Sequence, residues 1–243
     1  MTFSGQTVLI VGGSCDMALS LIPFLAGAGL RPVSTFRSTE GEQKIRNAGG
    51  TPCAFALQNA LEPDGFSTLD ALFQDGGPDY LVDFAHGNLE SLVATADVAA
   101  VGRYMQENVT CRAALVKWAS RRMMAGRFGR MLYVSSTAAA LQNGGQGFYA
   151  ASKQASESLY RGAGIELAKK GITSAILRPG YVSAGRGTDY LETHGDRIRQ
   201  RVPLGRAATP AEVAETLLFL LSDAARPINA TVVTMDGGLT ACK

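Results

Sequence analysis

Short runs of apolar residues recur along the chain, and longer segments with a helical spacing of apolar positions separate them. The apolar runs occupy residues 7–11, 31–36, 51–57, 79–85, 130–136, 172–179 and 231–236. Each run has the length of a strand, and the spacing between them suits helices. This alternation is typical of βαβ units, so we predict an α/β protein with a parallel sheet of about seven strands flanked by helices.

Length and composition limit the domain organisation and the partners. The chain has 243 residues, without internal repeat, low-complexity tract or linker. Undivided α/β folds often reach this length, so we expect residues 1–243 to form a single domain. The net charge is only +2, with no run of five basic residues, which gives no reason to expect a nucleic-acid partner.

The cysteines and the apolar runs indicate where the protein works. The four cysteines show neither CxxC nor Cys/His spacing, which disfavours a metal site or a disulfide framework. No run of eighteen apolar residues is long enough to span a bilayer, and the first residues lack the pattern of a secretion signal. We therefore expect a cytoplasmic protein without metal or membrane partner.

A serine, a tyrosine and a lysine stand at spacings that can bring their side chains together. Tyr149 and Lys153 are one helical turn apart, so on a helix both side chains project from the same face. Ser136 ends a predicted strand, and ligands of open α/β sheets bind beyond the carboxyl ends of strands. An ammonium within about 4 Å can supply the roughly 4 kcal/mol that lowers a tyrosine pKa from about 10 to about 7. These three residues are candidates for proton transfer to a carbonyl oxygen.

A glycine-containing turn follows the first predicted strand and leads into a helix. In residues 11–19, VGGSCDMAL, backbone amides and the positive helix end could meet a dinucleotide pyrophosphate. At the end of the second strand, Phe36 stands where an NAD enzyme places an acidic residue, and Arg37, Ser38 and Thr39 follow. Because a guanidinium can bind a 2′-phosphate, this segment favours NADPH.

With Ser136, the Tyr149-x-x-x-Lys153 pair and the glycine turn together, the chain resembles the short-chain dehydrogenase/reductase family. Within it, the chain is most similar to the 3-oxoacyl-[acyl-carrier-protein] reductases, and the resemblance covers essentially the whole chain. It implies a single-domain Rossmann fold with a doubly wound parallel sheet, and NADPH (NADP+) as cofactor. It also implies a homotetramer paired through the long helices that carry Asn108 and Tyr149.

The chain departs from the family at the glycine turn. The family pattern is Gly-x-x-x-Gly-x-Gly, but only Gly12 is kept, with Asp16 and Ala18 at the other two positions. The fingerprint tolerates the alanine. A carboxylate about 4 Å from a phosphate costs on the order of 4 kcal/mol at an effective dielectric of about 20. Either Asp16 is a helix N-cap that turns aside, the interpretation we favour, or cofactor affinity suffers.

The resemblance also assigns other positions. Asn59 corresponds to the side chain that holds the adenine, and residues 83–86, DFAH, stand in place of the family's Asn-Asn-Ala-Gly. His86 would then lie near the nicotinamide or the substrate entrance, but a lone histidine is more often structural, so we assign it no chemistry. The implied cofactor-binding residues are Gly12, Ser14, Asp16, Met17, Arg37, Ser38, Asn59, Ala85, Tyr149, Lys153, Pro179, Gly180 and Val182.

The family's catalytic asparagine corresponds to Asn108. An asparagine is unfavourable inside a helix unless its side chain has a task, so we expect a backbone distortion here, with a water held near the lysine. The implied catalytic set is Asn108, Ser136, Tyr149 and Lys153. The stretch after residues 178–187, RPGYVSAGRG, is predicted as a flexible substrate lid, followed by a helix that starts at Thr209 and Pro210.

These residues predict an NADPH-dependent ketoreductase that transfers hydride to a 3-oxoacyl thioester of fatty-acid or polyketide type. Arg127 and Lys170 match positions that dock an acidic acyl carrier protein in the family, although a solvated basic edge explains them equally well. One alternative is a reductase or dehydrogenase of a free small carbonyl compound. Another is a nucleotide-binding subunit without catalysis, suggested by the departures at residues 16, 18 and 83–86.

Overall fold

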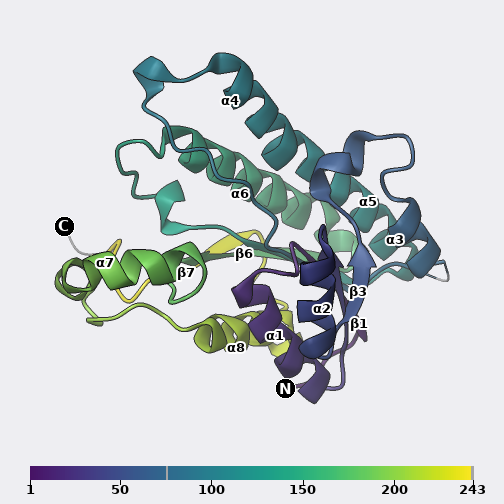
Figure 1. Ribbon diagram of the computed structural model, residues 1–243. Coiled ribbons are helices and arrows are strands. Elements are labelled where there is room, and N and C mark those ends of the chain that lie inside the picture. The colour runs from purple at the N-terminus through teal and green to yellow at the C-terminus, as the bar shows by residue number, and fades with distance from the viewer. Residues whose placement is uncertain (75, 242–243) are drawn as a thin grey trace.

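A computed structural model describes residues 1–74 and 76–241, apart from the side chains of residues 186–190 (Figure 1). One seven-stranded sheet runs through it, with the order β3-β2-β1-β4-β5-β6-β7 and every pairing parallel. Its strands are β1 (Thr7–Val11), β2 (Arg31–Phe36), β3 (Thr51–Ala54), β4 (Tyr80–Asp83), β5 (Gly129–Val134), β6 (Ile172–Pro179) and β7 (Thr231–Met235). The predicted doubly wound parallel sheet is confirmed.

Helices cover both faces of the sheet (Figure 1). They are α1 (Asp16–Gly27), α2 (Thr39–Asn47), α3 (Ser67–Leu72), α4 (Val98–Met105), α5 (Cys111–Gly126), α6 (Gly147–Leu167), α7 (Arg186–Arg201) and α8 (Pro210–Leu221). Short helices are η1 (Leu57–Leu61), η2 (Val93–Thr95), η4 (Thr137–Ala139), η5 (Ala168–Lys170) and η6 (Asp223–Ala225), and η3 (Gln106–Thr110) is a π-helix.

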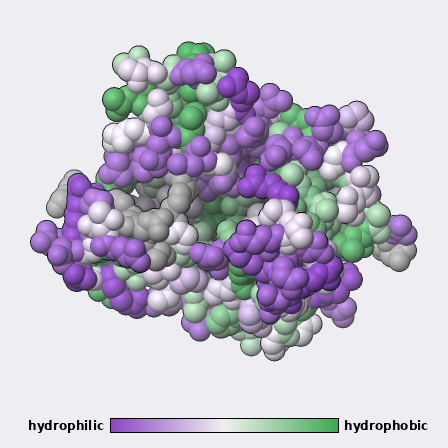
Figure 2. Space-filling model, viewed as in Figure 1, coloured by the Kyte–Doolittle hydropathy of each residue, from purple (hydrophilic) through white to green (hydrophobic). Residues whose placement is uncertain are grey.

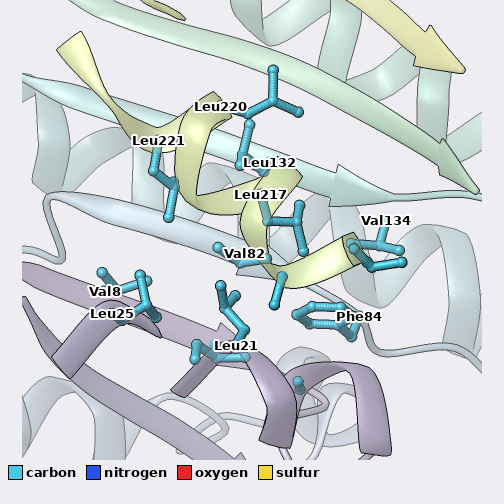
Figure 3. Close-up of a cluster of buried hydrophobic side chains, with 14 of the residues drawn as sticks. Val8, Leu21, Leu25, Val82, Phe84, Leu132, Val134, Leu217, Leu220 and Leu221 are labelled. Carbon is cyan, nitrogen blue, oxygen red and sulfur yellow. The ribbon is translucent and has the colours of Figure 1, made fainter. Parts of the chain in front are cut away.

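Alternate residues of each central strand feed two separate cores. On one face, β1, β4 and β5 pack against α1 and α8, with residues such as Val8, Leu21 and Leu217 fully buried (Figure 3). On the other face, residues such as Leu9 and Leu115 pack with α3, α5 and α6. Because both faces are covered, the strands read as continuous apolar runs rather than as alternating ones.

The strand register aligns the carboxyl ends of the central strands. Val11 pairs with Asp83, which in turn pairs with Tyr133, so β1, β4 and β5 end side by side. Chain order reverses between β1 and β4, and open α/β sheets bind ligands in the crevice at such a point. The fold therefore places any ligand near the residues that follow these three strands.

The predicted start of the last long helix is confirmed. Thr209 is the N-cap of α8, and its hydroxyl accepts a hydrogen bond from the Glu212 amide at 3.2 Å. The Glu212 carboxylate accepts one from the Thr209 amide at 2.8 Å, which completes a capping box around Pro210. Within the described residues, no helix is long and apolar enough to cross a membrane.

Candidate active site

Two serines follow β5, and they differ in burial and in their hydrogen-bond partners. Ser135 is buried and donates to Glu157 at 2.5 Å, and Arg178 holds the same carboxylate. Ser136 is half-buried, and its Oγ accepts a hydrogen bond from the Ala138 amide at 3.2 Å. Because that bond uses only an oxygen lone pair, the Ser136 hydroxyl proton stays available to a ligand.

Tyr149 and Lys153 lie one turn apart on α6, as the spacing predicts. The Lys153 Nζ is 5.8 Å from the centre of the Tyr149 ring and 5.0 Å from that of the Tyr133 ring. It also donates to the Val134 carbonyl at 3.0 Å, and the side chain is only 3% exposed. A buried ammonium beside the phenol favours the ionised form of that phenol.

Three cavities meet at this edge of the sheet, where the space-filling view shows the surface hollowed near its middle (Figure 2). The Lys153 cavity, of about 470 Å³, is lined by Ser136, Tyr149 and Lys153. The α7 cavity, of about 410 Å³, lies on the other side of Ser136 and Tyr149 and extends to α7. The Arg37 groove, of about 230 Å³, runs from the glycine turn to Arg37.

The Arg37 groove and the Lys153 cavity share Cys15, Phe84 and His86, so they adjoin each other. Together they extend from the end of β2, across the glycine turn, to the triad of Ser136, Tyr149 and Lys153. An extended dinucleotide could lie with one end near Arg37 and the other beside Lys153. The residues that are present therefore fit a dinucleotide.

The glycine turn is shaped by close backbone contacts. Gly12 has φ +75°, and a Cβ atom there would lie 2.6 Å from the Ala85 amide nitrogen, so only glycine fits. The Gly12 amide donates to Thr35 Oγ1 at 3.0 Å, which fastens the turn to β2. Ala18, at the family's third glycine position, is fully buried in the α1 packing, so its methyl group is accommodated.

Asp16 is not the helix N-cap that the sequence predicted. Cys15 occupies that position with extended backbone angles and no side-chain capping bond, and Asp16 is the first helical residue. The Asp16 carboxylate accepts a hydrogen bond from the Gly185 amide at 2.8 Å. It therefore does turn aside, toward the loop after β6, and it lines the Lys153 cavity rather than the Arg37 groove.

Two residues predicted to bind the cofactor, Ser38 and Asn59, have other positions or partners than the sequence predicted. Arg37 is exposed and lines the groove, whereas the Ser38 hydroxyl accepts the Gly41 amide at 3.2 Å as the N-cap of α2. Asn59 is exposed and does not line the groove; its neighbour Gln58 does. Because η1 is a tight helix, adjacent side chains point in different directions, and the sequence alone did not show which one faces the groove.

The remaining predicted cofactor positions lie where the strands end. Ser14 and Ala85 line the Arg37 groove, and Met17, Pro179, Gly180 and Val182 line the Lys153 cavity. A Cβ atom on Gly180 would come within 2.9 Å of the Asp236 Cα, so glycine is required there too. This contact joins the Pro-Gly segment to the residues after β7.

A buried ion pair lies beneath the crevice, at the departure in residues 83–86. Asp83 and Arg112 are both fully buried, and the Arg112 Nε donates to the Asp83 Oδ2 at 2.7 Å. Tyr160 donates to the same oxygen at 3.0 Å, and the Ala85 amide donates to Oδ1 at 3.0 Å. Burial opposes the charge of Arg112, but the Asp83 carboxylate raises its pKa above the ordinary value. Sequence reasoning missed Arg112, since nothing in the chain order links it to Asp83.

Asn108 lies within the π-helix η3, so the expected backbone distortion is confirmed. Its side-chain oxygen accepts the Gly87 amide at 2.7 Å, and its amide donates to the Tyr104 carbonyl at 2.9 Å. Its own carbonyl accepts a hydrogen bond from Arg112. Both polar ends of the Asn108 side chain thus have protein partners, and through the Gly87 amide Asn108 holds the segment that carries His86. The water expected near Lys153 stays a prediction.

His86 stands between the Arg37 groove and the Lys153 cavity, where the family has a glycine. Its Nε2 lies 2.9 Å from the Tyr104 hydroxyl and 3.2 Å from the Ser152 hydroxyl. Its ring meets the Tyr149 ring edge to face, with centres 5.1 Å apart. The histidine, to which the sequence interpretation gave no chemistry, is therefore part of the wall around Tyr149.

Arg127 and Lys170 lie at the amino-terminal ends of the strands, whereas Ser136 lies at the carboxyl-terminal end of β5. Arg127 ends α5 just before β5, and Lys170 lies just before β6, so both occupy the amino-terminal ends of these strands. Both are exposed, and they are neighbours, because a Cβ on Gly171 would lie 2.3 Å from the Arg127 carbonyl oxygen. Neither lines any of the three cavities.

Comparisons with known proteins agree with this geometry. A family model described as enoyl-(acyl carrier protein) reductase matches residues 65–240. The 3-oxoacyl-[acyl-carrier-protein] reductase MabA of Mycobacterium bovis is 28% identical over 242 residues, covering 98% of this chain and 94% of the relative. The FabG reductase of the same description from Escherichia coli is 27% identical over 241 residues, covering 98% and 99%.

Solved structures agree as well. A short chain dehydrogenase/reductase family protein superposes with a TM-score of 0.87 at 28% identity, over 100% of both chains. An oxidoreductase of the same family from Burkholderia thailandensis gives a TM-score of 0.87 at 25% identity, over 99% of this chain and 94% of the other. The chain belongs to the short-chain dehydrogenase/reductase family and is an oxidoreductase.

Proposed function

We propose that the protein is an NADPH-dependent ketoreductase that reduces a 3-oxoacyl thioester to the 3-hydroxyacyl product. The observation that carries the proposal is the meeting of Ser136, Tyr149 and Lys153 on one cavity that adjoins a dinucleotide-sized groove. The similarity to 3-oxoacyl-[acyl-carrier-protein] reductases supports the choice of substrate. Residues 1–243, built on one sheet, would act as a single cytoplasmic domain.

Each residue of the triad has a separate task. Bound NADPH would supply the hydride for the ketone carbon. Tyr149 donates its phenolic proton to the carbonyl oxygen as negative charge develops there, and Ser136 donates a hydrogen bond to the same oxygen. The Lys153 ammonium, 5.8 Å from the ring centre, stabilises the phenolate that Tyr149 becomes. Asn108 holds the Gly87 amide and thereby the wall that carries His86.

Arg37 supports NADPH rather than NADH. It is exposed at the end of β2 and lines the groove, and Phe36 supplies no carboxylate to bind a ribose hydroxyl. Its guanidinium can form charge-assisted hydrogen bonds with a 2′-phosphate. The Asp16 carboxylate turns toward the Gly185 amide and does not line the Arg37 groove, so it would lie away from a 2′-phosphate bound by Arg37.

An acyl carrier protein and a homotetramer belong to the same proposal. Arg127 and Lys170 lie far from the cavities of their own chain, at the other edge of the sheet. If they dock an acidic carrier, they do so for the cavity of a neighbouring subunit, which requires an assembly. Comparing turnover of a carrier-bound 3-oxoacyl thioester with its free thioester analogue tests carrier use against the alternative of a free carbonyl substrate.

The direct test of the proposal is Tyr149→Phe. We expect this variant to lose ketone reduction, measured as NADPH oxidation at 340 nm, because the ring remains and only the proton donor is removed. NADPH affinity, measured by fluorescence titration, should be retained. Undiminished turnover in the variant would refute the role of Tyr149. A wild-type protein that binds NADPH but reduces no ketone would instead favour a nucleotide-binding subunit without catalysis.

A further inference from the structure

The α7 cavity carries two arginines that the reduction does not use. It shares Ser136 and Tyr149 with the Lys153 cavity, so it opens directly onto the hydroxyls that would receive the ketone. Arg197 and Arg201 of α7 line its outer part. A substrate whose ketone meets Tyr149 from this side would therefore extend toward two guanidinium groups.

The position of the two arginines follows from how α7 is fastened. Ile198 and Val202 are only 2% and 3% exposed and pack with Leu239, and Tyr181 packs against the same cluster. Each buried residue directly follows one of the arginines in the chain. Arg197 and Arg201 are one helical turn apart, so they lie on the same side of α7, beside its buried stripe.

Neither of these arginines is paired with an acidic side chain in the described part of the protein. Among the described residues, the side chains of Arg197 and Arg201 make neither a hydrogen bond nor an ion pair, whereas the side chain of Arg199, between them, is paired with Asp196. Glu90 lines the same cavity, but no ion pair joins it to α7 in the described part of the chain. The outer part of the α7 cavity thus carries an excess of positive charge.

We infer that Arg197 and Arg201 bind an anionic group of the ketone substrate, a phosphate or a carboxylate, and so hold its ketone against Ser136 and Tyr149. Two guanidinium groups one turn apart can bind an oxyanion with several charge-assisted hydrogen bonds. This inference rests on the proposed ketone reduction. The anion would be either the phosphate of a pantetheine arm or the carboxylate of a free keto acid.

Two matched substrate pairs distinguish these sources. Acetoacetyl-phosphopantetheine is compared with acetoacetyl-pantetheine, and acetoacetate with its ethyl ester, for the wild type, for the double variant Arg197→Gln with Arg201→Gln, and for Arg199→Gln as the matched control. We expect the charged member of one pair to have the higher kcat/KM in the wild type. The double variant should lose that advantage by about tenfold or more. The neutral members and the control should be unchanged.

The pair that responds identifies the source of the anion. The inference is overturned if neither pair shows a charge preference in the wild type, or if the double variant slows neutral and charged members equally. If no ketone is reduced by any of the three proteins, the proposed function fails instead. Calorimetric titration of phosphopantetheine and of acetoacetate into the NADP+-loaded protein then decides the inference alone: binding lost in the double variant supports it, and no binding to the wild type overturns it.

Discussion

Replacing Arg112 by methionine tests whether the buried ion pair holds the floor of the crevice. Methionine keeps much of the length of the side chain but removes the guanidinium. Among the described residues, Tyr160 and the Ala85 amide would then be the only hydrogen-bond donors left to the fully buried Asp83 carboxylate. The Asn108 and Ala85 carbonyls would each lose a hydrogen-bond donor.

The magnitude follows from the burial of both partners. Removing one partner of a buried pair costs about 3–5 kcal/mol, because the other charge remains uncompensated. Folded domains are stable by only about 5–15 kcal/mol, so the variant should lose a large share of its stability. A loss of this size raises the unfolded fraction by roughly 10² to 10⁴-fold.

Urea unfolding followed by far-ultraviolet circular dichroism measures the effect. The control is Arg199→Met, which breaks the exposed pair with Asp196 and should leave the unfolding midpoint unchanged, because such surface pairs contribute little. Combining Arg112→Met with Asp83→Asn should cost much less than the sum of the two single variants, since the double variant leaves no isolated buried charge. Additive losses, or an Arg112→Met variant as stable as the control, would refute this account of the pair.

Three further predictions concern the groove, the wall around the tyrosine and α8. Arg37→Ala should weaken NADPH binding by about 10- to 100-fold and NADH binding little, measured by fluorescence titration, and equal losses would contradict the assignment. His86→Ala should lower kcat/KM by about 2- to 10-fold, because the edge contact with Tyr149 is worth about 0.5–1.5 kcal/mol; an unchanged value would show that the contact is idle. A hydrogen bond from Arg206 and a weaker effect of one from the Thr209 backbone lower the pKa of Glu212 from 4.5 to about 2. The Glu212 carboxylate therefore stabilises the fold fully above pH 4.5, and this stabilisation is lost as the pH falls toward 2. The difference in urea midpoint between wild type and Glu212→Gln should accordingly be largest near neutral pH and shrink over that window; a difference that does not vary with pH would exclude this carboxylate as the cause.

Much of the fold could be predicted because strands buried on both faces leave long apolar runs. The strand at residues 7–11 matches β1 at both ends, since every residue in it is buried. The run at residues 51–57 was predicted too long, because β3 ends at Ala54 and the apolar residues after it pack outside the sheet. Apolar character alone does not distinguish a strand end from a buried loop.

The candidate site could be predicted where spacing sets geometry, and not where the fold brings distant residues together. One helical turn was enough to place Tyr149 beside Lys153. The partner of Asp83, 29 positions away, depends on how α5 packs under β4, and no local pattern encodes that contact. The capping of α1 was predicted wrongly for a related reason: Cys15 takes the extended N-cap backbone, which leaves Asp16 free to reach another loop.

The hydrogen bond between Asp16 and Gly185 bears on how a nucleotide would enter and leave the Lys153 cavity. The Asp16 carboxylate and the Gly185 amide join the first turn of α1 to the segment just before α7, and both residues line the Lys153 cavity. The bond lies at the surface, and a hydrogen bond there is worth about 1 kcal/mol, so thermal motion breaks it for roughly a sixth of the time. The link between α1 and the loop before α7 is thus formed for most of the time but opens often, and a nucleotide could pass it without any unfolding of the sheet.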